Sequence, residues 1–189
     1  PVLCAGCPHR GVFYVLSKLK LNVLGDIGCY TLGAVPPLGS MDAVVCMGAS
    51  VGMAIGFDKA DPEAHKHSVA VIGDSTFIHS GITGLIDAVY NKAKITVVIL
   101  DNRTTGMTGH QNHPATGKTI KNEPTYELQL DEVCRAVGVK NVCTVDPGNL
   151  AETEAAIKAA LESDEVSVVI AKKPCVLLTK KLYNGFKVN

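Results

Sequence analysis

Two apolar runs dominate the pattern of hydrophobic and polar positions along this chain. Residues 68–72 (Ser-Val-Ala-Val-Ile) and 95–100 (Ile-Thr-Val-Val-Ile-Leu) are rich in β-branched side chains and almost without polar ones. Continuous runs of this kind are typical of strands that are buried on both faces of a parallel sheet. Between them, Gly81 to Asn91 predicts the helix that connects the two strands.

Weaker patterns extend this alternation over the rest of the chain. Further strands are predicted at Asn22 to Leu24, Val142 to Val145 and Val166 to Ala171. Further helices are predicted near Gly11 to Leu19, in a glycine-rich stretch that ends near Ala60, near Leu130 to Val137 and at Leu150 to Glu162. Alternating strands and helices predict an α/β fold, a doubly wound parallel sheet with helices on both faces.

Two glycine-containing segments are expected to lie near a ligand. Asn102 to Pro124 is rich in Thr, Gly, His and Asn. It is too long for a loop that only connects two elements of secondary structure, so we expect an active-site loop. Binding of a ligand would order its first half, unless packing against a partner domain keeps the segment ordered at all times. Gly48, Gly52 and Gly56 recur once per helical turn, which predicts close packing of that helix against a neighbour.

Composition narrows the class of protein. The chain has 189 residues, 47% of them hydrophobic, and equal numbers of basic and acidic residues, 18 each. That size and hydrophobicity suit one domain over residues 1–189. The balanced charge gives no reason to expect a nucleic acid or a membrane as partner, and without a signal peptide or apolar span we expect a cytoplasmic protein. The abrupt opening at Pro1 suggests a domain of a longer polypeptide.

Polar residues follow both of the strong strands. Gly73-Asp74-Ser75 comes after the first strand and Asp101-Asn102 after the second. Because the carboxyl ends of neighbouring parallel strands meet at one edge of a sheet, Asp74 and Asn102 should converge on one site. A carboxylate, an amide oxygen and a backbone carbonyl from the Arg103-Thr104 turn suit a magnesium diphosphate. Taken singly, both residues are also ordinary turn formers.

The pair resembles the thiamine diphosphate signature, Gly-Asp-Gly followed by Asn-Asn, although Ser75 replaces the third glycine and Asp101 the first asparagine. The strings at residues 73–85 and 100–111, with Cys-Ala-Gly-Cys-Pro-His-Arg at 4–10 and Gly-Asp-Ile-Gly-Cys-Tyr-Thr-Leu-Gly at 25–33, resemble the alpha subunits of indolepyruvate ferredoxin oxidoreductases. The resemblance covers nearly the whole chain and implies the thiamine diphosphate-binding fold.

The resemblance assigns roles to particular residues. Magnesium ligands are expected at Asp74, Asn102 and Thr104. The cofactor-binding residues expected beside them are Gly48, Gly73, Asp74, Ser75, Thr76, Asn102, Arg103, Thr104, Gly106, Met107 and Thr108. Arg103 would contact a phosphate or a carboxylate. The alternative is that its side chain lies in a loop and is exposed to solvent.

Seven cysteines without a secretory signal argue for thiols or metal ligands rather than disulfides. In the related 2-oxoacid ferredoxin oxidoreductases, cysteines in this order bind the 4Fe-4S cluster nearest to thiamine, which implies a cluster at Cys4, Cys7, Cys29 and Cys175. Structural zinc suits four thiolates as well. The other three, Cys46, Cys134 and Cys143, are expected in the core.

Histidines supply the candidates for proton transfer or for holding a substrate carboxylate. His9 and His79 are expected to face the substrate, and His110 and His113 lie in the long loop. We assign His9, His79 and His110 as candidate catalytic residues. The alternative for His79 is a structural role at the start of a helix, bonded to the backbone. His65 and His67 are expected at the surface.

The resemblance implies oxidative decarboxylation of an aryl 2-oxo acid to an acyl-coenzyme A, with electrons passed to iron-sulfur clusters and ferredoxin. A pyrimidine-binding domain or subunit would complete the active site, because no second domain here supplies the glutamate that thiamine needs. Two alternatives remain: a non-oxidative thiamine-dependent decarboxylase of the sulfopyruvate or phosphonopyruvate type, and a non-catalytic metal-binding interaction module.

Overall fold

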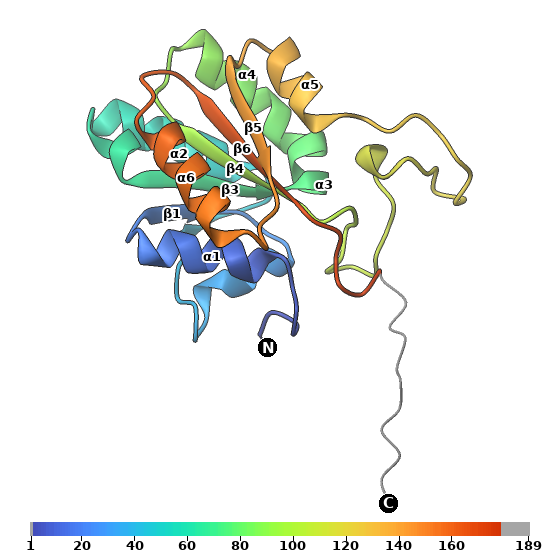
Figure 1. Ribbon diagram of the computed structural model, residues 1–189. Coiled ribbons are helices and arrows are strands. Elements are labelled where there is room, and N and C mark those ends of the chain that lie inside the picture. Colours follow the sequence, from blue (N-terminus) through green and yellow to red (C-terminus); the bar gives the residue numbers. More distant parts are fainter. Residues whose placement is uncertain (1, 179–189) are drawn as a thin grey trace, which may run out of the picture.

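A six-stranded sheet in which every pair of neighbours is parallel forms the centre of the molecule, with the strand order β2-β1-β3-β4-β6-β5 (Figure 1). The computed structural model describes residues 2–178, so residues 1 and 179–189 of the predicted domain lie outside it. The strands are β1 (Asn22–Gly25), β2 (Ala43–Val44), β3 (Ser68–Gly73), β4 (Thr96–Asp101), β5 (Asn141–Val145) and β6 (Ser167–Lys172).

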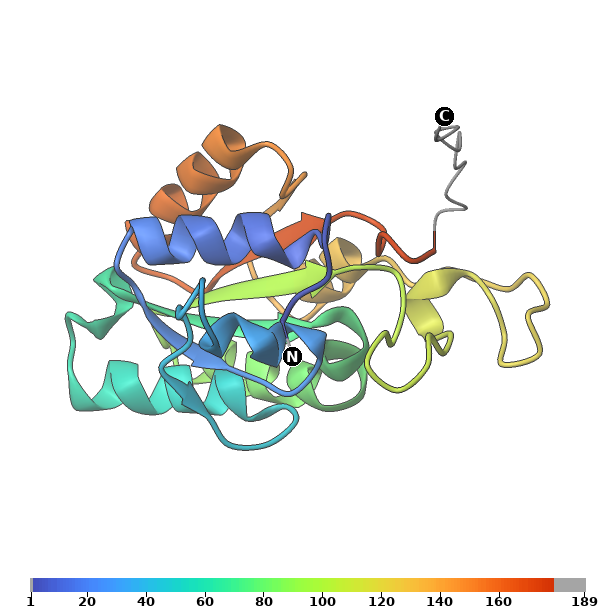
Figure 2. The same ribbon diagram turned by 90° about the horizontal axis from the view of Figure 1, so that it is seen from below.

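Helices cover both faces of this sheet (Figure 2). On one face lie α1 (His9–Lys18) and α6 (Leu150–Leu161), and on the other lie α2 (Ala49–Ala60), α4 (Ile82–Tyr90) and α5 (Leu130–Ala136). Shorter turns are η1 (Cys29–Ala34), η2 (Ala64–Lys66), α3 (Asp74–Thr76), the π-helical η3 (Phe77–Gly81) and η4 (Pro114–Thr116). The predicted doubly wound α/β architecture is confirmed.

The apolar residues of the central strands divide between two cores. Val97 and Ile99 of β4 belong to the core under α2, α4 and α5, whereas Val98 and Leu100 belong to the core under α1 and α6. All six residues of β4 are buried, which explains why its sequence is apolar throughout rather than alternating. Phe13 of α1 is completely buried in the second core, and truncating such a side chain costs about 3 to 5 kcal/mol.

The strand ends differ from the sequence expectation in one respect that matters for the site. The helical connection after β3 begins directly at Asp74 and continues through η3 into α4, rather than beginning at Gly81. Asp74 therefore occupies a first helical turn, where a carboxylate is favourable beside the free N–H groups. Strand β2 was not predicted, because two residues are too few to display a period.

The expected close packing of the glycine-rich helix is wrong at two of its three glycines. A Cβ added to Gly52 or Gly56 would meet nothing within 4 Å in the described structure. Gly48 must lack a side chain, because its φ is +89° and a Cβ there would lie 2.7 Å from Cβ of Ser80.

Three further expectations about burial are wrong. Cys46 and Cys143 are exposed, because the first lies in the loop after β2 and the second on the edge strand β5; only Cys134 is buried as expected. His65 is buried, and its Nδ1 lies 2.8 Å from the carbonyl oxygen of Pro62. His67 is exposed, as expected. Among residues 2–178, no helix is both long enough and apolar enough to cross a membrane.

Candidate functional site at the ends of strands β3 and β4

The carboxyl ends of β3 and β4 bring the predicted ligand residues together. Gly73 pairs with Leu100 in the parallel register, so the residues that follow them leave the sheet side by side. The backbone N–H of Arg103 donates to Oδ2 of Asp74 at 2.9 Å, which joins the two strand ends directly. The sequence prediction that these two strand ends converge is confirmed.

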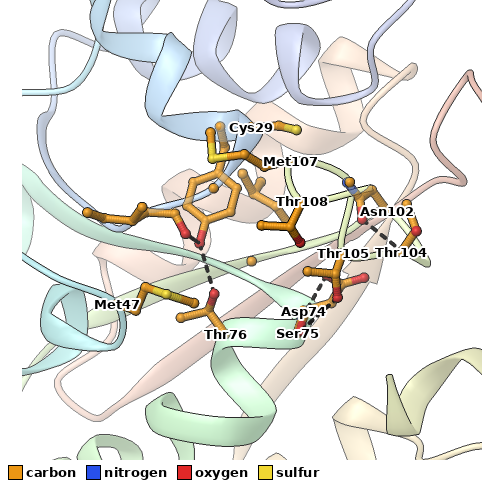
Figure 3. Close-up of a pocket in the computed structure, with 16 residues that line it drawn as sticks. Cys29, Met47, Asp74, Ser75, Thr76, Asn102, Thr104, Thr105, Met107 and Thr108 are labelled. Carbon is orange, nitrogen blue, oxygen red and sulfur yellow. Dashed lines mark hydrogen bonds between the residues drawn. The ribbon is translucent and has the colours of Figure 1, made fainter. Parts of the chain in front are cut away.

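A pocket opens over these strand ends (Figure 3). Among its lining residues, those singled out from the sequence are Gly73, Asp74, Ser75, Thr76, Asn102, Thr104, Gly106, Met107 and Thr108. Those not assigned to it are Ile27, Gly28, Cys29, Tyr30, Met47, Leu100 and Thr105. Residues 27–30 follow β1, the other neighbour of β3, so the same strand-end reasoning would have identified them.

Asp74 is 3% exposed and is held from three sides. Its Oδ1 accepts a hydrogen bond from the backbone N–H of Ser75 at 2.8 Å, and its Oδ2 accepts from Arg103 and lies 3.1 Å from Nε2 of His113. An ionised carboxylate has room for about four such interactions. Its Oδ1, with a single donor in place, can still bind a cation.

Asn102 is also buried, and its side chain is oriented on both sides. Its Oδ1 accepts from the backbone N–H of Thr104 at 3.1 Å, and its Nδ2 lies 3.2 Å from Nε2 of His9. An amide oxygen has two lone pairs, so one remains. Asp74, Asn102 and the nearby backbone of Thr104 thus form an oxygen donor set of the kind that magnesium binds.

A second buried carboxylate, that of Asp101, lies beside Asp74. Burial is the main reason that its pKa is raised to about 6, and the charge of Asp74 raises it further, whereas Arg103 lowers it. The guanidinium of Arg103 lies 3.8 Å from Asp101 and 2.7 Å from Glu127. Asp101 lines a separate small pocket with Arg103, not the pocket that Asp74 lines.

Two of the predicted cofactor-binding residues do not line the pocket. Arg103 directs its guanidinium to Asp101 and Glu127, so only its backbone serves the site. Gly48 shapes the turn before α2, where its N–H donates to Oδ2 of Asp26 at 2.8 Å. The neighbouring Met47 lines the pocket instead (Figure 3).

The long segment that follows Asn102 is tied to the pocket at its start. Thr105 donates from its hydroxyl to Oγ of Ser75 at 3.0 Å, and its backbone pairs with Gln111 in a short antiparallel bridge. Gly106 lies near the same pocket, and a Cβ there would be 3.4 Å from the sulfur of Cys29. Residues 104–108 therefore all line the pocket, and Figure 3 labels four of them, Thr104, Thr105, Met107 and Thr108.

The four cysteines of the expected cluster line one second pocket, although they come from both ends of the chain. The reason lies in the sheet: beyond β6 the chain continues beside the end of β4, so that the N–H of Cys175 donates to the carbonyl oxygen of Asn102 at 2.9 Å. Cys4 and Cys7 share one turn, and Cys29 begins η1. Cys29, Asn102, Gly106 and Met107 line both pockets, so the two adjoin.

The thiols influence one another. Burial raises the pKa of Cys7 to about 11; the backbone of His9 lowers it, and the negative charges of Cys175, Cys4 and Cys29 raise it again. Yet in the described part of the chain no three His, Cys, Asp or Glu side chains are grouped to hold a single metal ion.

The candidate histidines lie in different surroundings. His79 is exposed, bonds to Ser80 and lines neither pocket, so the structure does not bring it to the site. His110 and His9 both line the cysteine pocket. His9 is buried behind Asn102, and burial lowers its pKa to about 4, which keeps it neutral. His113, not chosen as catalytic, touches Asp74.

The chain is similar to known proteins over most of its length. Residues 26–171 match the family model "Thiamine pyrophosphate enzyme, C-terminal TPP binding domain". The chain is 46% identical over 184 residues to indolepyruvate oxidoreductase subunit IorA of Archaeoglobus fulgidus and 41% identical over 191 residues to that of Pyrococcus horikoshii. Each match covers 94% of this chain and 29% of the relative, so the chain spans about three tenths of their length.

A solved structure shares the fold. A chain of 2-oxoglutarate:ferredoxin oxidoreductase from Magnetococcus marinus superposes with a TM-score of 0.79 and 20% identity, covering 95% of this chain and 65% of that one. The six parallel strands and their helices therefore form the fold of that enzyme class, as predicted.

The raised pKa of Asp101 predicts that Asp101→Asn increases the stability of the folded protein, by an amount that depends on pH. The folded state holds the Asp101 proton more tightly than the unfolded state, so the wild type loses stability as pH rises from about 4 to 6. The asparagine variant escapes this loss. Without metal, we expect its advantage in urea unfolding to grow from near zero at pH 4 to about 1 to 3 kcal/mol at pH 7.

The matched control for that measurement is Asp87→Asn, which removes an exposed carboxylate from α4. Its effect on the free energy of unfolding should vary little between pH 4 and 7. A gain for Asp101→Asn that is equally large at pH 4 and pH 7 would contradict the assigned burial and repulsion.

Proposed function

This chain belongs to the family of thiamine pyrophosphate enzymes, as their C-terminal TPP-binding domain, and we propose that it binds magnesium and thiamine diphosphate in the pocket at the ends of β3 and β4. The observation that carries the proposal is the pair of buried oxygen ligands, Asp74 and Asn102, each with a position left for a cation. The wider function that we propose is that of the cofactor-binding part of an indolepyruvate-type 2-oxoacid ferredoxin oxidoreductase.

In this proposal Asp74, Asn102 and the backbone carbonyl of Thr104 hold the magnesium ion. The hydroxyl groups of Ser75, Thr76 and Thr108 line the same pocket and offer hydrogen bonds to diphosphate oxygens. When bound, thiamine diphosphate supplies the nucleophilic carbon for decarboxylation of a 2-oxo acid. The protein orients that cofactor and excludes water around it.

We further propose that Cys4, Cys7, Cys29 and Cys175 hold a 4Fe-4S cluster. Its support is the pocket that all four cysteines line and the mutual influence of their thiols. When bound, such a cluster accepts and passes on single electrons. Because Cys29 also lines the thiamine pocket, electrons would have a short path between the two cofactors.

This arrangement favours the oxidative reaction over the two alternatives. A non-oxidative decarboxylase has no need for four converging thiols beside its thiamine pocket. A non-catalytic metal-binding module has no need for a magnesium donor set that is buried and oriented by hydrogen bonds. The relatives at 41 to 46% identity are named as oxidoreductase subunits, which also favours the oxidative reaction.

The active site would be completed by a partner domain or subunit. Thiamine diphosphate requires a carboxylate against its aminopyrimidine ring, and no glutamate is among the described residues that line the pocket. Large apolar side chains remain exposed at its rim, with Met47 at 48% and Met107 at 52%. We propose that a pyrimidine-binding domain covers them, and that ferredoxin, coenzyme A and an aryl 2-oxo acid are the further partners.

The first test of this proposal is Asp74→Asn in the full-length subunit together with its partner. The change keeps the shape of the side chain but removes the charge that magnesium needs. Thiamine diphosphate affinity, measured by equilibrium dialysis with saturating magnesium, should fall at least about 100-fold. The control Asp87→Asn should bind like the wild type, and normal affinity in Asp74→Asn would refute the assigned site.

The cluster is tested by iron analysis of anaerobically purified full-length subunit. Cys29→Ala should remove the irons of one cluster and weaken the broad visible absorption, because a cubane needs four thiolates. Cys143→Ala, which changes an exposed cysteine on β5, should keep the wild-type iron content. Zinc in place of iron in the wild type, or unchanged iron in Cys29→Ala, would contradict the cluster.

A further inference from the structure

Two buried histidines lie directly behind the two side chains that we assign to magnesium. His113 is 8% exposed and contacts Asp74, and His9 is 3% exposed and contacts Asn102. They come from distant parts of the chain: His9 begins α1, and His113 precedes η4 in the long segment after β4. Neither ring lines the thiamine pocket itself.

His113 is oriented as a hydrogen-bond donor to Asp74. Its Nδ1 accepts from the backbone N–H of Ala115 at 3.4 Å, so the ring proton resides on Nε2. That nitrogen lies 3.1 Å from Oδ2 of Asp74 and donates to it. The hydroxyl of Thr116 bonds the backbone of His113 on both sides, which fixes the residue before the turn.

His9 accepts a hydrogen bond from its partner, whereas His113 donates one. Because Oδ1 of Asn102 accepts from the N–H of Thr104, the amide nitrogen of Asn102 must point at His9, whose Nε2 accepts at 3.2 Å. The His9 ring meets Tyr30 edge to face, with centroids 6.0 Å apart and planes at 87°. This packing holds the imidazole in place.

We propose that His113 and His9 are positioning residues, which fix the carboxylate of Asp74 and the amide of Asn102 so that both present oxygen to magnesium. A flipped Asn102 would aim its N–H groups at the cation, and the acceptor nitrogen of His9 prevents that flip. A donor behind Asp74 keeps one oxygen occupied and leaves the other for the metal. Hydrogen-bond partners behind metal ligands commonly change metal affinity by 10- to 100-fold.

The inference rests on the proposed function, since it presumes that magnesium binds at Asp74 and Asn102. The test therefore uses the full-length subunit with its partner and measures the magnesium concentration that gives half-maximal thiamine diphosphate binding in equilibrium dialysis. Wild-type protein that binds no thiamine diphosphate at any magnesium concentration overturns the proposed function, and the positioning role with it. Wild-type binding upholds the function and lets the histidine variants decide the role.

The variants separate loss of the hydrogen bond from loss of the imidazole ring. His113→Leu and His9→Leu remove the hydrogen bonds, and each should raise the half-maximal magnesium concentration about 10-fold or more. Glutamine places an amide where Nε2 was and supplies either a donor or an acceptor. His113→Gln and His9→Gln should therefore stay within about 3-fold of the wild type.

The matched control is His65→Leu, which removes another buried imidazole beside the opposite end of β3. It should lower the melting temperature of the metal-free protein without changing its magnesium requirement. Leucine variants with a wild-type magnesium requirement would overturn the positioning role. Should a leucine variant fail to fold, His113→Asn and His9→Asn, whose amides are too short for these contacts, take its place and must show the same raised requirement.

Discussion

The satisfaction of one buried charge, the Asp74 carboxylate, is the constraint on which the candidate site depends. In a parallel sheet the end of β3 lies beside the end of β4, and Asp74 uses this closeness to accept a hydrogen bond from the backbone of Arg103. Ser75 and His113 provide its other donors. A buried carboxylate without such partners is costly, so the same bonds that stabilise the charge also bring the long loop to the pocket and leave one side of the carboxylate for a cation.

The two departures from the thiamine diphosphate signature now have a physical account. Ser75 replaces a glycine and accepts a hydrogen bond from Thr105, while Asp101 replaces an asparagine and pairs with Arg103, which also bonds Glu127. Both changes tie the segment after β4 to the ends of the strands.

Local pattern was sufficient for the sheet and for the convergence of Asp74 and Asn102, because burial on both faces makes β3 and β4 continuously apolar and parallel register fixes where they end. It was insufficient wherever a contact joins distant residues. His113 and Asp74 are 39 positions apart, and nothing in the residues around His113 signals the contact. The burial of His9 could not be read from a lone histidine beside a cysteine pair. The cysteine grouping followed from the order of cysteines in related proteins, not from any period.

The loop after β1 contributes side chains to both pockets. Tyr30 packs against Gly73 so closely that a Cβ on that glycine would lie 2.5 Å from its ring, and its hydroxyl lies 3.4 Å from that of Thr76. The preceding residue, Cys29, directs its sulfur toward the wall formed by Gly106 and lines both pockets. Because Cys29 and Tyr30 lie in one short 3-10 turn, η1 supplies wall residues where the thiamine pocket and the cysteine pocket adjoin.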